Sequence, residues 1–207
     1  MTAADPPDAV AGYTSVAKAL HWLMAVMVFG LFGLGIYMTD LPLSPEKLQL
    51  YSWHKWAGVT FFTLVWLRLI WRVTHQPPPF SAQMTAGLRR AAHLGHAALY
   101  VLMLAIPLSG WLMSSAKGFQ TVWFGIIPLP DLIEKNRELG DILVLLHKGL
   151  AVSLMILVVG HTLMALKHHF KDRDGTLLRM LFSSHPQVAA PASAQTRPSS
   201  AFPSERS

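Results

Sequence analysis

Four long apolar stretches dominate the pattern of hydrophobic and polar positions along the chain. They run over Val16–Met38, Tyr51–Val73, Ala91–Ser114 and Ile142–Leu166. A bilayer core of about 30 Å is crossed by about 20 helical residues, so each stretch is long enough to span it. The stretches are separated by polar or proline-rich segments, such as Pro77–Pro79, through which no helix continues. The pattern therefore predicts an all-α fold, an integral membrane four-helix up-down bundle.

The remaining segments predict how the chain is divided. Residues 1–15 form a predicted polar leader, residues 16–182 the four-helix membrane domain, and residues 183–207 a disordered tail rich in Ser and Pro. The first apolar stretch is too long for a cleaved signal peptide, so we expect it to be retained. Lys and Arg are more numerous on the side that holds both chain ends, which predicts cytoplasmic N- and C-termini.

Composition supports a membrane location and narrows the chemistry. The chain is 52% hydrophobic and 14% charged, whereas soluble domains carry about 25% charged residues. The net charge of +6 comes from residues that flank the apolar stretches, so it does not indicate a nucleic-acid partner. The chain has no cysteine, which excludes disulfides, iron–sulfur ligation and covalently attached c-type haem. It has ten histidines, and several of them lie within the apolar stretches.

An up-down bundle places these histidines at two depths. His147 and His161 are on the fourth stretch, about 21 Å apart at about 1.5 Å per residue, and their separation of fourteen residues puts both rings on one face. At the outer depth, the partner available to His147 is His54. At the inner, cytoplasmic depth, spacing leaves three candidate partners for His161: His21, His93 and His96.

Two imidazoles at each of two depths are what two stacked haems require. Two axial imidazoles leave no open position on the iron, which suits electron transfer rather than oxygen binding. A flat macrocycle also needs small residues nearby, for which the candidates are Gly58, Gly95, Gly149 and Gly160.

Lys55 and Lys148 each directly follow an outer-level histidine. They could be anchors that extend to the membrane surface. Alternatively, they form a positive collar that pairs with haem propionates or steers a small anion to the haem edge.

Other interpretations of the histidines remain open. A single histidine in a membrane helix can be a packing or interfacial residue, which we expect for His93, His169 and His185, and His168 is open to the same reading. A zinc transporter would also use histidines. The apolar stretches contain almost no Asp or Glu, however, and the histidines are divided between two depths, which argues against a clustered zinc site.

Three segments resemble the bacterial cytochrome b561 family. They are Tyr13–Leu23, Ala92–His96 with Pro107 and Gly110 following, and Gly160–Met180. The resemblance extends from about Tyr13 to Leu181, and it lies in the order and spacing of these segments rather than in one motif.

The resemblance implies a bacterial inner-membrane cytochrome with two non-covalent haem b groups. It implies that His21 and His161 hold one haem and that His54 and His147 hold the other. It further implies oxidation of superoxide at the outer face, where Lys55 and Lys148 would act, and reduction of ubiquinone, which His168 would contact. Membrane lipid, quinone and superoxide are then the expected partners. The alternative is a b-type subunit that links a dehydrogenase or hydrogenase partner protein to the quinone pool.

Overall fold

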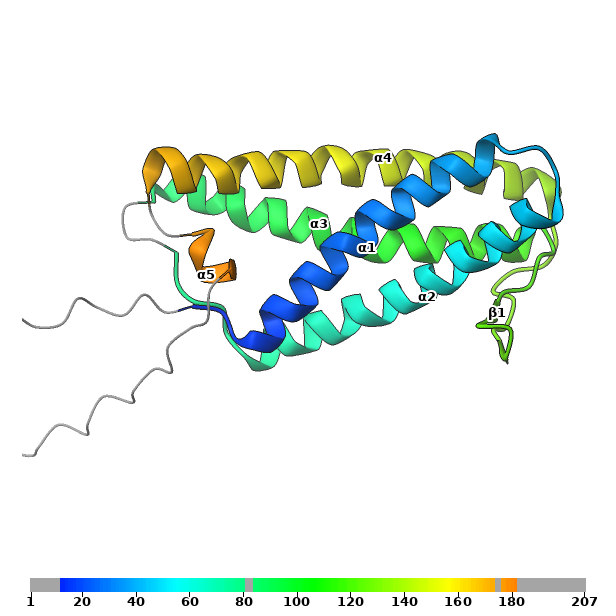
Figure 1. Cartoon of the computed structure of the whole chain (residues 1–207), viewed down its shortest axis with the longest axis horizontal. Helices are drawn as coiled ribbons and strands as arrows, with labels where there is room; N and C mark the ends of the chain where they lie inside the picture. The colour runs from blue at the N-terminus through cyan, green and yellow to red at the C-terminus, as the bar shows by residue number, and fades with distance from the viewer. Residues whose placement is uncertain (1–11, 81–83, 174–175, 182–207) are drawn as a thin grey trace, which may run out of the picture.

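The computed structural model describes residues 12–80, 84–173 and 176–181. Four long helices form the bundle (Figure 1): α1 (Ser15–Asp40), α2 (Pro45–Thr74), α3 (Ala86–Ala116) and α4 (Arg137–Lys167). All four are long and apolar enough to cross a membrane, so the predicted four-helix membrane fold is confirmed. Most of the predicted leader and the predicted tail at residues 183–207 lie outside the described residues.

Each long helix extends past the apolar stretch that predicted it because polar caps set its first residue. A side-chain oxygen accepts a hydrogen bond from the backbone N–H three residues later in all four cases: Thr14, Ser44, Thr85 and Asn136. The helix α2 therefore begins at Pro45 rather than Tyr51, with the proline in the first turn, where its missing N–H costs nothing.

The helices alternate in direction, so the bundle has two distinct ends. The helix α1 packs mainly on α2, and α3 packs mainly on α4 (Figure 1). We call the end at which α1 begins and α4 finishes the termini end, and the opposite end the hairpin end.

A small β-hairpin in the α3–α4 connection gives the hairpin end its name. Strands β1 (Val122–Trp123) and β2 (Ile127–Pro128) are antiparallel, and Phe124 and Gly125 turn between them with φ of 50° and 72°. The Trp56 indole N–H donates to the Val122 carbonyl at 2.6 Å, and the Trp123 indole lies 3.3 Å from the Trp56 carbonyl. These two indoles dock the hairpin on α2.

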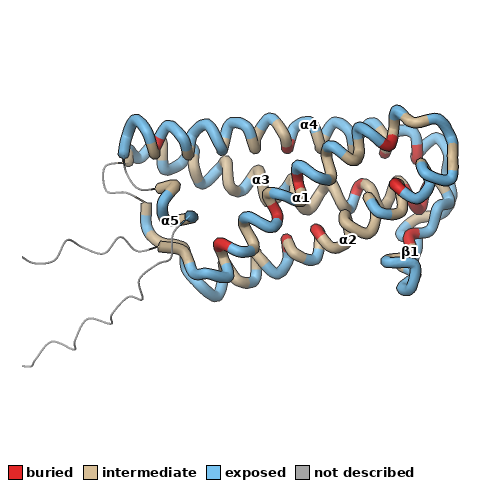
Figure 2. Tube along the Cα trace, in the orientation of Figure 1, coloured by how far each residue is buried: buried red, intermediate tan, exposed pale blue. Residues whose placement is uncertain are grey.

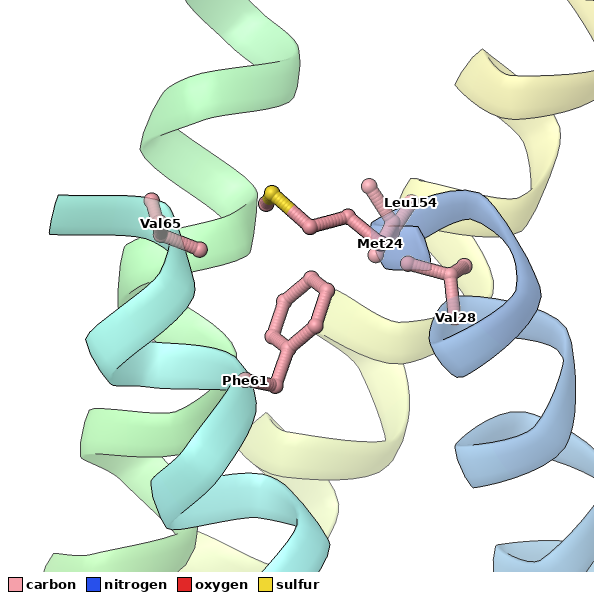
Figure 3. Packing of buried hydrophobic residues seen from close by; sticks show 5 residues of the cluster. All are labelled: Met24, Val28, Phe61, Val65 and Leu154. Atoms are coloured by element: carbon pink, nitrogen blue, oxygen red, sulfur yellow. The ribbon is translucent and has the colours of Figure 1, made fainter. Parts of the chain in front are cut away.

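The apolar centre of the bundle lies between the two histidine depths. Its buried residues come from three helices: Met24 and Val28 from α1, Phe61 and Val65 from α2, and Leu154 from α4 (Figure 3). Leu154 is seven residues from both His147 and His161, about 10 Å from each at about 1.5 Å per residue. Much of the remaining helix surface is exposed (Figure 2), as expected of helices that face lipid.

The chain continues beyond α4 and covers part of the termini end. The π-helical turn η1 (His168–Asp172) extends α4, and the short helix α5 (Leu178–Leu181) lies beside the start of α1. The Trp22 indole donates to the Met180 carbonyl at 3.0 Å, and the Arg179 guanidinium donates to the Pro79 carbonyl at 2.7 Å. These bonds tie α5 to α1 and to the segment after α2.

Candidate functional site

Four of the predicted histidines meet in two pairs. The ring centres of His54 and His147 are 6.3 Å apart, and those of His21 and His161 are also 6.3 Å apart. Two imidazoles that share one metal, each about 2 Å from it through a ring nitrogen, have ring centres roughly 6 Å apart. The ring separation in each pair therefore fits two histidines that ligate one iron, with one iron for each pair.

A cavity surrounds the His54–His147 pair at the hairpin end. Its volume is about 490 Å³, within the range of about 300–1,000 Å³ typical of small-molecule and cofactor sites. It is lined mainly by apolar side chains from all four helices, and both histidines reach into it. Its polar or small lining residues include Gly35, Tyr51, Lys55, Gly58, Gly110, Thr121 and Lys148. A mostly apolar lining with two imidazoles suits a large flat macrocycle.

The second ring nitrogens of this pair differ in their partners. The Nδ1 of His147 donates to the backbone carbonyl of Ile106 at 3.0 Å, because a carbonyl can only accept. The neutral ring therefore carries its lone pair on Nε2, the form that binds a metal. The Nδ1 of His54 is buried and has no hydrogen-bond partner among the described residues. A metal bonded at this nitrogen would satisfy a polar atom that is otherwise unpaired.

Two glycines allow these rings to approach neighbouring helices. A Cβ at Gly110 would lie 3.1 Å from the Cε1 of His147, and one at Gly35 would lie 3.4 Å from the Cε1 of His54. Sequence reasoning missed both as contact positions. It chose Gly58, Gly95, Gly149 and Gly160, at none of which would a Cβ meet another atom within 4 Å. Of these four, Gly58 lines the cavity.

The two predicted lysines both line the cavity but differ in their contacts. The Lys55 ammonium donates to the Phe119 carbonyl at 3.0 Å and thereby holds the segment before the hairpin. Lys148 is exposed, and within the described ranges its ammonium makes no hydrogen bond or ion pair. Lys148 is therefore the lysine whose charge is available to an approaching anion.

Three histidines meet at the termini end. His161 faces His21 at 6.3 Å and His96 at 5.5 Å between ring centres. His93 instead packs against Phe80, with ring centres 5.0 Å apart, so it is separate from this cluster. The structure thus removes one of the three candidate partners that spacing left open and keeps the other two.

Arg68 of α2 connects three helices beside this cluster. Its guanidinium donates to the Ala17 carbonyl at 3.0 Å and to the Tyr100 hydroxyl at 3.2 Å, and it lies 3.3 Å from the Nδ1 of His21. A guanidinium can only donate, so His21 accepts through Nδ1 and the neutral ring keeps its proton on Nε2. Iron binding through that Nε2 would require this contact to change.

Tyr13 precedes α1 and lies near three arginines at the same end. Burial raises the pKa of the Tyr13 phenol, although the positive charges of Arg72, Arg68 and Arg179 act to lower that pKa. The phenol therefore stays neutral at physiological pH and does not cancel the positive charge of the arginines.

His168 lies in the π-helical turn η1 and is buried. Its Nδ1 is 2.9 Å from the Oδ2 of Asp172. His168 is thus at the start of a π-helical turn, a conformation that occurs often at functional sites, and Asp172 is on the same turn.

Within the described part of the chain, no three His, Cys, Asp or Glu side chains are grouped to hold a bare metal ion. A pair of imidazoles is nevertheless a complete protein contribution for a haem, because the macrocycle supplies the other ligands. The residues present therefore fit haem iron better than a zinc ion.

Comparison with known proteins identifies the family of the chain. A family model described as prokaryotic cytochrome b561 matches residues 12–183, which include all four long helices. Cytochrome b561 homolog 2 of Escherichia coli K12 is 38% identical over 179 residues, covering 83% of this chain and 92% of that protein. The probable superoxide oxidase CybB of Yersinia pestis is 29% identical over 177 residues, which cover 82% of this chain and 95% of that protein. Cytochrome b561 homolog 1 of Escherichia coli K12 is 28% identical over 165 residues, with 78% and 92% covered.

Proposed function

Because the chain belongs to the prokaryotic cytochrome b561 family, we propose that it holds two haems b, oxidises superoxide and reduces ubiquinone. It is a multi-pass protein of the bacterial inner membrane that carries out electron transfer. In this proposal His54 and His147 hold one haem, and His21 and His161 hold the other. The arrangement that carries it is two histidine pairs with equal ring separation, each with one member on α4.

The protein's contribution at the hairpin end is a fixed ligand pair in an apolar cavity. Haem b, when bound, supplies one-electron redox chemistry, and two imidazole ligands favour electron transfer over oxygen binding. His147 presents Nε2 because its Nδ1 proton is held by Ile106. The lining of the cavity around the pair is mainly apolar.

Positive charge at the cavity supports an anionic electron donor. Lys148 would attract superoxide through its exposed ammonium, and Lys55 would hold the wall formed by Phe119 while adding a second charge. In the net reaction two superoxide anions each lose one electron to become oxygen, and ubiquinone gains two electrons and two protons. We further propose that the hairpin end faces out of the cell and that both termini are cytoplasmic.

His168 is our proposed contact for ubiquinone near the termini end. It is buried in the π-helical turn, and its Nδ1 lies 2.9 Å from the Asp172 carboxylate. A histidine beside a quinone oxygen can donate the hydrogen bond or proton that reduction requires.

Haem quantitation tests the ligand assignment directly. We expect two haems in the purified protein, one in His54→Ala and one in His161→Ala, and none when His147 and His161 are both replaced. His93→Ala is the matched control, because that ring packs against Phe80 and should leave the haem content unchanged. Haem that survives loss of both α4 histidines would contradict the assignment.

Mixing the purified protein with superoxide and a ubiquinone analogue tests the reaction. Quinol formation that follows superoxide consumption is expected. Haem that superoxide fails to reduce would instead favour the second candidate, an electron-transfer subunit for a dehydrogenase or hydrogenase partner.

A further inference from the structure

His147 is held by a short segment of α3, whereas His54 is not held in this way. Ile106, Ser109 and Gly110 of α3 all contact the His147 ring. The Nδ1 of His54 has no hydrogen-bond partner in the described ranges. Of the two ligand rings at the hairpin end, His147 is therefore the one whose orientation is fixed by hydrogen bonds.

Ser109 closes a three-membered hydrogen-bond cluster around that ring. Ser109 is buried, with 4% of its surface exposed, and its hydroxyl donates to the Ile106 carbonyl at 2.8 Å. The same oxygen lies 3.1 Å from the Nδ1 of His147. Since the hydroxyl proton goes to the carbonyl, the serine oxygen presents a lone pair to the Nδ1–H. The Nδ1–H thus faces two acceptors, the carbonyl and the hydroxyl.

Gly110 makes this close approach possible. A Cβ at position 110 would lie 3.1 Å from the Cε1 and 3.3 Å from the Nδ1 of His147. The ring can therefore sit against α3 only where that helix has no side chain. Ser109 and Gly110 together form the surface of α3 against which the Nδ1 and Cε1 edge of the His147 ring lies.

The termini end lacks an equivalent cluster. No hydrogen bond of the His161 ring is found among the described residues, and the Nδ1 of His21 accepts from Arg68 instead of donating. Any influence of a hydroxyl on a ligand ring should therefore be confined to one of the two levels.

We propose that Ser109 is a positioning residue that acts through His147 to lower the reduction potential of the haem at the hairpin end. The inference rests on the proposed function, since it requires His147 to ligate a haem iron. A ligand imidazole whose second N–H donates to good acceptors is more basic, and a more basic ligand stabilises the oxidised iron. Removing the hydroxyl removes one of the two acceptors, so the potential of that haem should rise.

The test is a redox titration followed by visible absorption, together with haem quantitation. Ser109→Thr keeps a hydroxyl. Ser109→Val gives a side chain of the same shape as threonine but without the hydroxyl, so comparing these two variants separates hydrogen bonding from packing. Ser153→Ala is the control, because Ser153 also donates to a backbone carbonyl on a spanning helix, at 2.9 Å, away from both histidine pairs. We expect Ser109→Val and Ser109→Ala to raise the potential of one haem and leave the other unchanged. Ser109→Thr and Ser153→Ala should match the parent protein.

The possible failures are distinguishable. A parent protein that contains no haem would overturn the proposed function and this inference with it. A parent protein with two haems whose potentials are the same in Ser109→Val and Ser109→Thr would overturn the role of Ser109 alone. Loss of one haem in Ser109→Val with retention of both in Ser109→Thr would support the role in a stronger form, since only the hydroxyl differs.

Discussion

The two histidine levels differ in what meets the second nitrogen of a ligand ring. At the hairpin end the Nδ1 of His147 donates to the uncharged Ile106 carbonyl, whereas at the termini end the Nδ1 of His21 accepts from the Arg68 guanidinium. A neutral acceptor increases electron density on the ring, and a nearby cation favours the reduced, less positive iron. The bundle thus gives its two levels unlike electrostatic surroundings, although the ring separations are the same.

This difference predicts the direction of electron transfer. The haem at the hairpin end should have the lower potential and the haem at the termini end the higher one. Arg68 contacts a ligand ring at the termini end, whereas at the hairpin end the Lys55 ammonium is bound to a carbonyl and Lys148 is exposed. Electrons would then move energetically downhill from the cavity with Lys148 toward the end that carries His168. That is the direction required for superoxide as donor and ubiquinone as acceptor.

The largest expected effect concerns the choice of partner for His161. We expect His21→Ala to lose one of the two haems and His96→Ala to retain both, because the ring separation of 6.3 Å suits a shared metal and that of 5.5 Å is shorter. Haem quantitation on the purified variants decides the question. The reverse result would assign the ligand role to His96 and leave His21 as the partner of Arg68.

Gly110→Ala should be the next most damaging change, and it affects the other level. The added methyl would lie 3.1 Å from the His147 ring and push it away from α3, at a cost of about 1–3 kcal/mol typical of overpacking. We expect reduced haem occupancy at the hairpin end and an unchanged second haem. Gly149→Ala is the control, since a Cβ there meets no atom within 4 Å. Equal haem content in the two variants would show that the ring can move without loss of its function.

Arg68→Gln tests the electrostatic half of the comparison. We expect both haems to be retained and the potential of one to fall, because a positive charge beside His21 is removed. In Arg68→Lys the potential of that haem should fall less, since lysine keeps the positive charge but not the planar set of donors. Arg89→Gln, an exposed arginine at the start of α3, should leave both potentials in place. A redox titration measures all three, and a rise in potential for Arg68→Gln would contradict the proposed direction of electron transfer.

The sequence predicted the spans and the depths of the histidines well because both depend on position along a helix. The fourteen-residue separation of His147 and His161 fixes their distance and common face regardless of how α4 is packed. The contacts of Gly35, Ser109 and Arg68 depend instead on how each helix is rotated against its neighbours. In a membrane both the lipid-facing and the inward-facing sides are apolar, so the hydrophobic pattern does not reveal that rotation.

The hairpin escaped prediction for a different reason. Its strands are two residues long and are held by the indoles of Trp56 and Trp123, which are contacts between segments far apart in the chain. The same long-range geometry changed the interpretation of Lys55. Next to His54 in the sequence it looked equivalent to Lys148, but its ammonium is bound to the Phe119 carbonyl.

The smallest expected effect is on the rate of haem reduction by superoxide, and it distinguishes Lys148 from Lys55. Lys148→Gln should lower the rate of haem reduction by superoxide by roughly twofold, as expected for a loss of about 0.5 kcal/mol from one partly screened surface charge. Lys55→Gln should change the salt dependence of this rate less, because the charge of Lys55 is already close to a carbonyl dipole. It should, however, loosen the wall of the cavity that Phe119 forms. Stopped-flow rates at low and high ionic strength distinguish the two. If Lys148 steers the anion, the difference between Lys148→Gln and the parent protein disappears at high salt, whereas a structural effect of Lys55→Gln persists there. Equal, salt-independent rates in all three proteins would remove the electrostatic role of the cavity and leave only its ligand pair.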